Sequence, residues 1–416
     1  MATRQTERRR YKSCIGGEKL GVGFSDLIDG GFKLREVAND QTGWLLIDAT
    51  QNCAIMCQFT SPTQVGVGAE MSMKRILFAL LGASIVFTLS GCTGGSTDST
   101  SSSASSTPAS TPDSGGKKLR IGMVFDSGGR GDKSFNDSAY AGLEKAEKEL
   151  GVEIQTVDSK AEKDYSINLT TLAEQKFDVI FAIGITQGEA LAAVAPKFPD
   201  VKFAIVDATV EAPNVRSLLF SEEEGSYLAG YAAGLATKSN KIGFVGGKKI
   251  PLIEKFEAGY KAGAMAANPK VEMLPSKYTE SWDDTQLGKE SAKSLFNTGA
   301  DIVYHAAGRC GVGVIAAAKE AGKLAIGVDS NQDDQAPGFV LTSMIKRVDE
   351  SVFQTIKDIK GGSFSAGSKV YDLASNGVGL SDFKNTKDRI GEDNLKKIEA
   401  VKADIVAKKI TVPTKL

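Results

Sequence analysis

From residue 117 onward, short apolar runs alternate with segments in which apolar residues recur at helical spacing. In the helix expected at 134–151, one face carries Ala139, Leu143, Ala146 and Leu150, and Gly151 follows as a stop signal. A first series of apolar runs predicts strands at 119–126, 152–159, 177–184, 201–208 and 215–221. Strands that alternate with helices indicate a parallel sheet covered on both faces.

A second series of the same kind predicts strands at 241–247, 271–278, 300–308 and 323–330. Between the two series, residues 225–238 are rich in Gly and Ala and predict a helix suited to close packing. A strand at 339–346 and a helix at 348–360 follow the second series, and we expect them to cross back to the first lobe. The fold class is therefore α/β, with two doubly wound lobes, a hinge and an interlobe cleft.

These patterns predict the following boundaries. Lobe 1 comprises residues 117–237 and about 339–372, and lobe 2 comprises 238–338 and about 373–416. Each lobe is long enough to bury a core of its own.

Residues 71–92 have the features of a lipoprotein export signal. Lys74 and Arg75 precede an apolar run at 76–89, which is short for a bilayer span but suits a signal peptide. Small residues then lead to Cys92, as in the bacterial lipobox, where cleavage precedes a cysteine that receives a lipid. The alternative is a buried core helix followed by an incidental cysteine.

The segments on either side of this signal support the lipoprotein interpretation. Residues 92–116, after the signal peptide at 71–91, are rich in Ser and Thr and predict a flexible tether. Residues 1–70 show no sustained helical or alternating period. We expect them to be an upstream extension absent from the mature protein, with Met71 or Met73 as the true start.

Composition excludes several classes of protein. The net charge is −1 in 416 residues, which gives no electrostatic reason to expect nucleic-acid binding. The single histidine, His305, rules out a multi-histidine zinc site, and a Ser-His-Asp triad would have to use it. Cys53 and Cys57 lack nearby partner ligands, so we predict neither a metal nor a cofactor.

Candidate binding residues follow the predicted strands. Asp126, Asp207 and Asp329 each end a strand, and Gly308 and Lys346 end two others. In open α/β sheets, ligands bind outside the carboxyl ends of the strands. Any one of these aspartates could be a turn or cap residue, but their shared placement indicates a site.

Seven segments together resemble the basic membrane protein family of ABC-transporter substrate-binding lipoproteins, a group similar to purine nucleoside receptor lipoproteins. The segments are 124–143, 203–208, 221–247, 281–284, 305–322, 325–332 and 342–349. The most specific are Asp-Lys-Ser-Phe-Asn at 132–136, and the pair His-Ala-Ala-Gly at 305–308 with Gly-Val-Asp at 327–329. The resemblance covers about 119–380 and implies a type I periplasmic-binding-protein fold with the ligand in the cleft.

The resemblance also implies roles for particular residues. Phe135 would stack on one face of a base, Asn136 would hydrogen-bond its edge, and Trp282 would stack on the other face. Asp207 would bind the base from the same lobe as Phe135.

The remaining contacts concern the sugar and the rim. Gly308 would offer backbone contact near the sugar, Asp329 and Lys346 would hold the ribose hydroxyls, and Asp126 would shape the rim of the first lobe. Stacking is worth roughly 1–3 kcal/mol per base. Several aspartates without an arginine cluster would repel a phosphorylated ligand.

The aromatic candidates also have structural interpretations. Phe135 shares a helical face with Ala139 and could belong to the core. Trp282 could form a hydrophobic staple beside a capping box begun by Asp283. We assign Phe256 to the core.

The other candidates near the site also have structural interpretations. We assign His305 a structural role inside a strand. Gly308, Gly311 and Gly313 open a helix and could present amides to a ligand. Cys310 departs from the small or hydroxyl residue expected in this loop, although its side chain need not face the cleft.

Three other classes of protein compete with a transport receptor. A sugar-responsive repressor would need a DNA-binding headpiece, which residues 1–70 do not supply. A nucleoside hydrolase would need a clustered aspartate calcium site or a poised base. A surface adhesin or ligand sensor of the same fold stays open.

We therefore expect an extracytoplasmic solute-binding protein, not an enzyme, that captures purine nucleosides and delivers them to the membrane subunits of an ABC importer. The expected location is the cell membrane, on the periplasmic or outer side, through a lipid on Cys92. We expect a monomer without a nucleic-acid partner.

Overall fold

The computed structural model describes residues 32–39, 42–49, 53–59 and 118–416. The predicted signal peptide, Cys92 and the tether lie outside the described residues. The described parts belong to two compact units, divided between Pro108 and Ala109.

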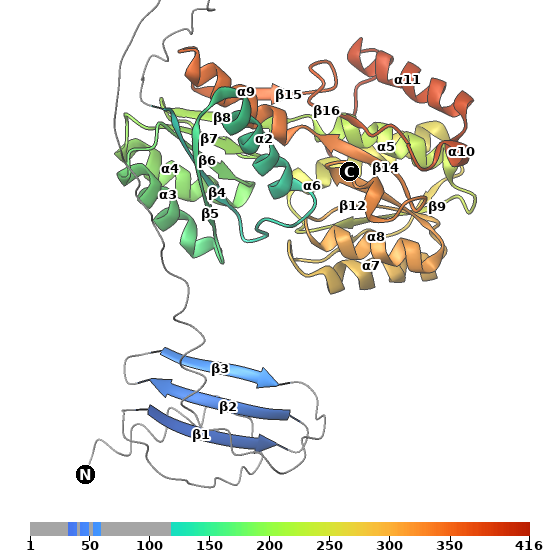
Figure 1. Cartoon of the computed structure of the whole chain (residues 1–416). Coiled ribbons are helices and arrows are strands. Elements are labelled where there is room, and N and C mark those ends of the chain that lie inside the picture. The colour runs from blue at the N-terminus through green and yellow to red at the C-terminus, as the bar shows by residue number, and fades with distance from the viewer. Residues whose placement is uncertain (1–31, 40–41, 50–52, 60–117) are drawn as a thin grey trace, which may run out of the picture. The chain divides into compact units, whose positions relative to one another are not determined.

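The N-terminal unit contains an antiparallel sheet of β1 (Phe32–Asn39), β2 (Thr42–Ala49) and β3 (Cys53–Phe59), in that order (Figure 1). The sequence predicts no element here. Residues 44–47 and 53–57 are nearly continuous apolar runs, and such runs give no alternating signal.

The first lobe of the second unit has a parallel sheet in the order β15-β8-β7-β6-β4-β5. Its strands are β4 (Arg120–Phe125), β5 (Glu153–Asp158), β6 (Val179–Ile183), β7 (Lys202–Val206), β8 (Val215–Phe220) and β15 (Gly367–Tyr371). Its helices are α2 (Phe135–Leu150), α3 (Tyr165–Glu174), α4 (Gly188–Val194) and α9 (Val348–Lys360). The predicted stop of α2 is confirmed, because Gly151 caps it with a φ of 65°.

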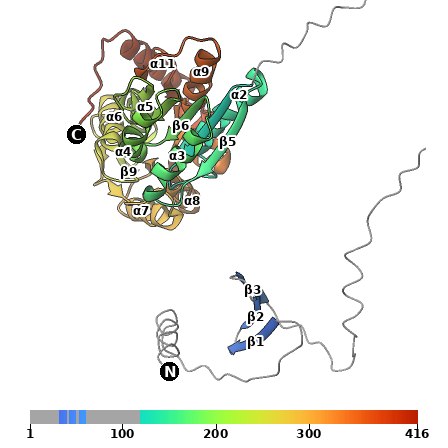
Figure 2. The same cartoon turned by 90° about the vertical axis from the view of Figure 1, so that its left-hand side faces the viewer.

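The central strands β4, β6 and β7 are buried on both faces, as the apolar runs predict. Along β4, Met123 and Phe125 join a core with Leu143 of α2, whereas Val124 joins a separate core with Leu172 of α3. Strand residues thus alternate between two helical layers. The first lobe faces the viewer in Figure 2.

The second lobe has a sheet in the order β10-β9-β12-β13-β14-β16, with β11 also paired to β9. Its strands are β9 (Lys241–Gly246), β10 (Glu272–Met273), β11 (Lys277–Tyr278), β12 (Ile302–Ala306), β13 (Leu324–Asp329), β14 (Val340–Lys346) and β16 (Val378–Leu380). Only β16 pairs antiparallel in this sheet.

The helices of the second lobe form layers on its sheet (Figure 1). They are α5 (Glu222–Ala236), α6 (Pro251–Ala267), α7 (Thr285–Asn297), α8 (Cys310–Ala321), α10 (Lys387–Ile390) and α11 (Glu392–Val406). Short 3-10 turns also occur in both lobes. They are η2 (Glu162–Asp164), η3 (Ile185–Gln187) and η4 (Ala195–Lys197) in lobe 1, and η5 (Asp333–Gln335) in lobe 2. Among the helices that the structure describes, none is both long and apolar enough to cross a membrane.

The small-residue helix predicted at 225–238 is α5, and it packs closely on α6. A Cβ built on Gly230 would overlap the carbonyl of Tyr260, and one on Gly263 would overlap the carbonyl of Tyr227. Side chains at these glycines would push the two helices apart. Because α5 packs on α6, it belongs to lobe 2, which corrects the predicted boundary at residue 237.

The structure also corrects the predicted crossing near residue 339. Strand β14 lies in the second sheet, parallel to β13, so the chain returns to lobe 1 only after Lys346. An apolar run at 339–346 fits either sheet, and its sequence contains no signal that selects one. The lobes are therefore 118–220 with 348–371, and 222–346 with 378–416.

Three segments connect the lobes, after β8, β14 and β15. They are hydrogen-bonded to one another, because Ser221 N donates to the Tyr371 carbonyl at 3.0 Å and Arg347 N donates to the Gly377 carbonyl at 2.9 Å. Adjacent crossings of this kind form a hinge about which the lobes can rotate.

Candidate functional site

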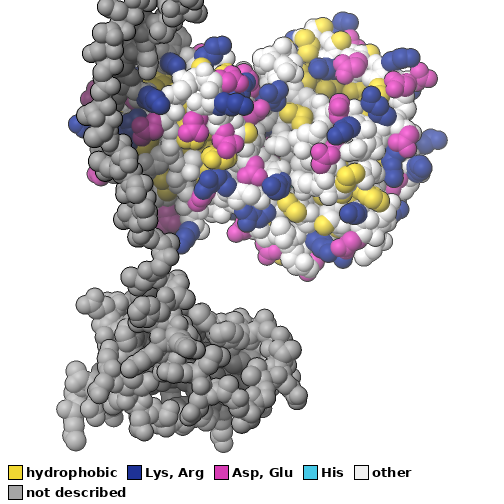
Figure 3. Space-filling model, in the orientation of Figure 1, with side chains coloured by type: hydrophobic (Ala, Val, Ile, Leu, Met, Phe, Trp, Pro, Cys, Tyr) yellow, Lys and Arg dark blue, Asp and Glu magenta, His cyan; other side chains and the backbone are white. Residues whose placement is uncertain are grey.

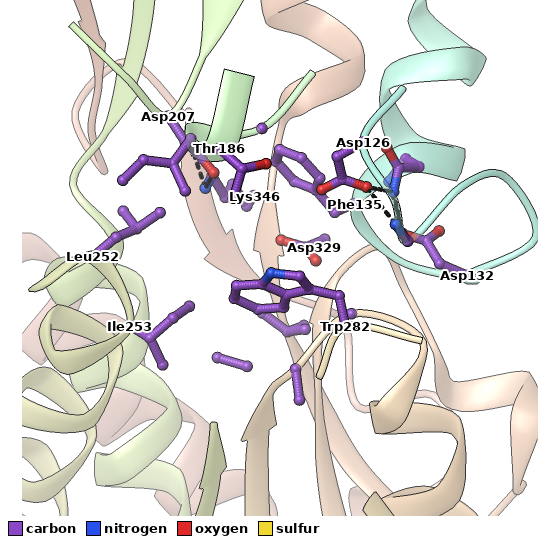
Figure 4. Close-up of a pocket in the computed structure, with 18 of the residues that line it drawn as sticks. Asp126, Asp132, Phe135, Thr186, Asp207, Leu252, Ile253, Trp282, Asp329 and Lys346 are labelled. Atoms are coloured by element: carbon purple, nitrogen blue, oxygen red, sulfur yellow. Dashed lines mark hydrogen bonds and ion pairs between the residues drawn. The ribbon is translucent and has the colours of Figure 1, made fainter. Parts of the chain in front are cut away.

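One pocket lies at the carboxyl ends of the strands of both lobes and contains about 620 Å³ of empty space, including space open to solvent (Figure 4). Every residue that the resemblance implicates lines it: Asp126, Phe135, Asn136, Asp207, Trp282, Gly308, Asp329 and Lys346. The structure thus brings together residues more than 200 positions apart in the sequence.

Asp126 and Asn136 form a buried polar wall on lobe 1. Asp126 Oδ1 accepts hydrogen bonds from Asn136 Nδ2 and from Gly128 N, both at 2.9 Å. Burial raises the pKa of Asp126 to about 6. Asn136 Oδ1 is buried without a partner among the described residues, which leaves an acceptor available to a ligand.

Asp132 also lines the pocket, although the sequence gives it no role. Its carboxylate accepts from Ser134 N, Asn136 N and Asp137 N at 2.8–3.1 Å, so it caps the start of α2 and orients Asn136. Asp132 lies in a loop and not at the end of a strand, so the strand-end placement that marks the other aspartates could not identify it.

Lys346 is a buried cation at the back of the pocket. Its Nζ lies 2.7 Å from both carboxylate oxygens of Asp207 and 3.1 Å from Glu222 Oε1, and 1% of its side chain is exposed. Burial lowers the pKa of Lys346, but the carboxylates of Asp207, Glu222 and Asp329 outweigh burial and hold it above its ordinary value. The ion pair joins the lobes, because Asp207 follows β7 and Lys346 ends β14.

Asp329 ends β13 and faces the pocket in Figure 4. Its Oδ2 accepts from Ser134 Oγ of the other lobe, and burial raises its pKa to about 7. Asp329 and Asp207 have φ values of 63° and 71°. This left-handed conformation costs of order 1–3 kcal/mol and is concentrated at functional sites.

Aromatic side chains from both lobes reach the pocket (Figure 4). Trp282 lies directly against Gly247, where a Cβ would overlap the indole ring. The predicted capping box at Asp283 is wrong, because Asp284 caps α7 by accepting from Gln286 N and Leu287 N at 2.9 and 3.2 Å. The staple interpretation of Trp282 loses its basis.

Phe256 belongs to the buried core, as predicted, and it also lines the pocket. Its ring centroid lies 5.6 Å from Lys346 Nζ, and that of Phe135 lies 5.3 Å away. Aromatic faces at this range stabilise a cation. A pocket wall and a core share the same helical spacing, so the sequence pattern does not separate them.

The glycines that open α8 serve packing. A Cβ on Gly311 would overlap the His305 ring, and one on Gly313 would overlap the Thr285 carbonyl. Gly308 alone of the three lines the pocket. Cys310 is buried, with Sγ 3.3 Å from the Ser281 carbonyl. His305 is buried inside β12, outside the pocket lining, and burial lowers its pKa to about 4.

The balance of charge limits the ligands that this pocket accepts. Four carboxylates line it, from Asp126, Asp132, Asp207 and Asp329, and Lys346 is the cation among its lining residues. Lys346 is already paired with Asp207. Such a site favours a neutral ligand that offers hydrogen-bond donors and flat apolar faces, and it opposes an anionic one.

A two-lobed α/β molecule with an interlobe pocket and a hinge defines the class of type I periplasmic binding proteins. A structure of this class, an ABC-transporter solute-binding protein from Aeropyrum pernix K1, superposes with a TM-score of 0.67 at 30% sequence identity. The match covers 71% of this chain and 93% of that one.

Sequence comparison identifies the family. Residues 119–415 match the model of the family described as ABC transporter substrate-binding protein PnrA-like, and the chain belongs to this family. One relative is the ABC transporter nucleoside-binding protein BmpA of Lactococcus lactis subsp. cremoris, at 36% identity over 71% of this chain and 90% of the relative. Another is an uncharacterized lipoprotein of Pyrococcus abyssi, at 36% identity over 76% and 79%. The predicted resemblance is confirmed.

Proposed function

We propose that the protein captures nucleosides, purine nucleosides in particular, in the interlobe pocket and delivers them to an ABC importer. The observation that carries this proposal is the convergence of Phe135 and Trp282 with Asp329 and Lys346 in one pocket. A purine nucleoside has two flat faces for the rings and vicinal hydroxyls for the charged groups. The nucleoside-binding name of the Lactococcus relative supports the same ligand class.

Each part of the nucleoside has a candidate partner. The two aromatic rings would hold the base, and the free Asn136 Oδ1 would accept from a base N–H. Asp329 would accept from ribose hydroxyls, while Lys346 would donate to them. Asp207 holds Lys346 in place through both carboxylate oxygens, so we assign it this positioning role in addition to the predicted contact with the base.

Capture would proceed by closure of the lobes about the hinge. A ligand that contacts Asn136 on lobe 1 and Trp282 on lobe 2 stabilises the closed form by its differential affinity for it. The proposed lipid on Cys92 would keep the protein at the membrane beside the importer. The relative named a lipoprotein supports this anchor.

The same site offers little for hydrolysis. No group of three or more His, Cys, Asp or Glu side chains that could hold a metal occurs within the described residues. The family and the similar solved structure are solute-binding proteins. After incubation with guanosine, we expect chromatography to recover the nucleoside intact; release of free guanine would contradict the binding role.

Isothermal titration calorimetry tests the ligand class. We expect guanosine, inosine or adenosine to bind, and guanosine 5′-monophosphate to bind at least about tenfold more weakly because of the unpaired carboxylates. Absence of heat with every nucleoside would overturn the ligand assignment. Equal affinity for the monophosphate would overturn the electrostatic argument.

A further inference from the structure

Backbone N–H groups of loop 130–134 in lobe 1 donate hydrogen bonds to two nearby carboxylates. Gly131 N and Lys133 N donate to the Asp137 carboxylate at 2.6 and 3.0 Å, and Ser134 N donates to Asp132 Oδ1 at 2.9 Å. Lys133 adopts a φ of 58°, unusual for a residue other than glycine. The two carboxylates therefore hold this loop in one conformation.

The carbonyls of the same loop point to lobe 2. The Arg130 carbonyl accepts from an Arg309 guanidinium nitrogen at 2.6 Å, and the Lys133 carbonyl accepts from Gln332 Nε2 at 2.9 Å. The Ser134 carbonyl accepts from Ser330 Oγ at 3.3 Å. All three bonds cross between the lobes, so they must break when the lobes separate.

The neighbours of Gln332 orient its side chain toward the Lys133 carbonyl. It is 1% exposed, and its Oε1 accepts from Val328 N at 3.0 Å and lies 3.0 Å from His305 Nε2. Because Oε1 is an acceptor only, the His305 nitrogen that faces it carries the hydrogen. These two bonds orient the amide so that its Nε2 points at the Lys133 carbonyl. His305 therefore helps to orient Gln332, although it lies outside the pocket lining.

We propose that loop 130–134 with Arg309, Ser330 and Gln332 forms an interlobe latch that slows release of the ligand. Phe135 and Asn136 follow this loop directly, so docking of the loop also fixes the residues proposed to hold the base. Arg309 and Gln332 are outside the pocket lining, which makes them positioning residues. The latch rests on the proposed function in that it acts on release of the same nucleoside.

Two variants remove the latch by different routes. Gln332→Glu keeps the acceptors for Val328 N and His305 but loses the donor to the Lys133 carbonyl, and Arg309→Met loses the donor to the Arg130 carbonyl. Two controls are matched to these changes at exposed residues of lobe 2. Gln286→Glu, in α7, adds the same charge, and Arg389→Met removes another arginine. Stopped-flow fluorescence of Trp282 follows guanosine binding and release.

We expect both latch variants to release guanosine about tenfold faster, while their association rates stay within about twofold of wild type. Both controls should release it at the wild-type rate. If wild type binds guanosine and both latch variants release it at the wild-type rate, the latch is refuted and the proposed function stands.

Small-angle X-ray scattering separates this outcome from a wrong ligand. If wild type binds no nucleoside, the ligand assignment fails, and the latch is judged on the ligand-free protein. It predicts a larger radius of gyration for Gln332→Glu than for Gln286→Glu at equal melting temperature. Equal radii would then overturn the latch.

Discussion

The buried ion pair between Lys346 and Asp207 makes the sharpest prediction about stability. Lys346→Met removes the cation and leaves Asp207, whose side chain is 6% exposed, without a charge partner. Glu222 keeps Lys255, with Nζ 2.7 Å from its Oε2, so Asp207 is the ion-paired carboxylate that is left without a cation. Loss of one partner of a buried pair costs about 3–5 kcal/mol.

The assay is urea unfolding of the ligand-free protein, followed by circular dichroism. We expect Lys346→Met to lose about 3–5 kcal/mol, and the double variant Lys346→Met with Asp207→Asn to recover about half of this loss or more. Lys369→Met, at a lysine whose side chain is 42% exposed, serves as the control and should stay within about 0.5 kcal/mol of wild type. A double variant as unstable as the single one would refute the argument from unpaired charge.

Three further predictions concern the pocket and the packing around it. Burial raises the pKa of Asp329 to about 7, so between about pH 4 and pH 7 the folded protein holds a proton on Asp329 that the unfolded chain has lost. The free energy of unfolding should therefore fall as the pH rises through this range. The midpoint of urea unfolding should fall less over the same range for Asp329→Asn, which has no carboxyl to titrate. Trp282→Ala should weaken guanosine binding tenfold or more in calorimetry, because one stacking face is lost; an unchanged affinity would contradict the stacking role. Gly230→Ala should lower the melting temperature, because a Cβ there overlaps the Tyr260 carbonyl, whereas Gly379→Ala, with open space around it, should not.

Much of the fold follows from the sequence because parallel sheets leave a strong pattern. The central strands of lobe 1, such as β6 and β7, are buried on both faces and read as apolar runs. The carboxyl ends of parallel strands share one edge of their sheet, which groups Asp126 with Asp207 in lobe 1 and places Asp329 at the corresponding edge in lobe 2. This rule predicts which residues lie near the binding site, but it does not predict which side chains form pairs there.

The sequence pattern could not predict which side chains contact each other across the two lobes. Lys346 and Asp207 are 139 positions apart, and their contact depends on which sheet receives β14. Asp132 lies within a loop, and Phe256 has the spacing of a core residue, so neither differs in pattern from a structural residue. The surface gives no further guide, because charged side chains of both signs are interspersed over the described face in Figure 3.

The central claim is that this pocket binds a neutral purine nucleoside between its lobes. Calorimetric titration of wild type and Asp329→Ala with guanosine tests it most directly, with guanosine 5′-monophosphate as the charged comparison. We predict binding of guanosine to wild type, at least about tenfold weaker binding to Asp329→Ala, and similarly weaker binding of the monophosphate to wild type. No heat with guanosine, inosine or adenosine, or an affinity indifferent to Asp329, would contradict the claim.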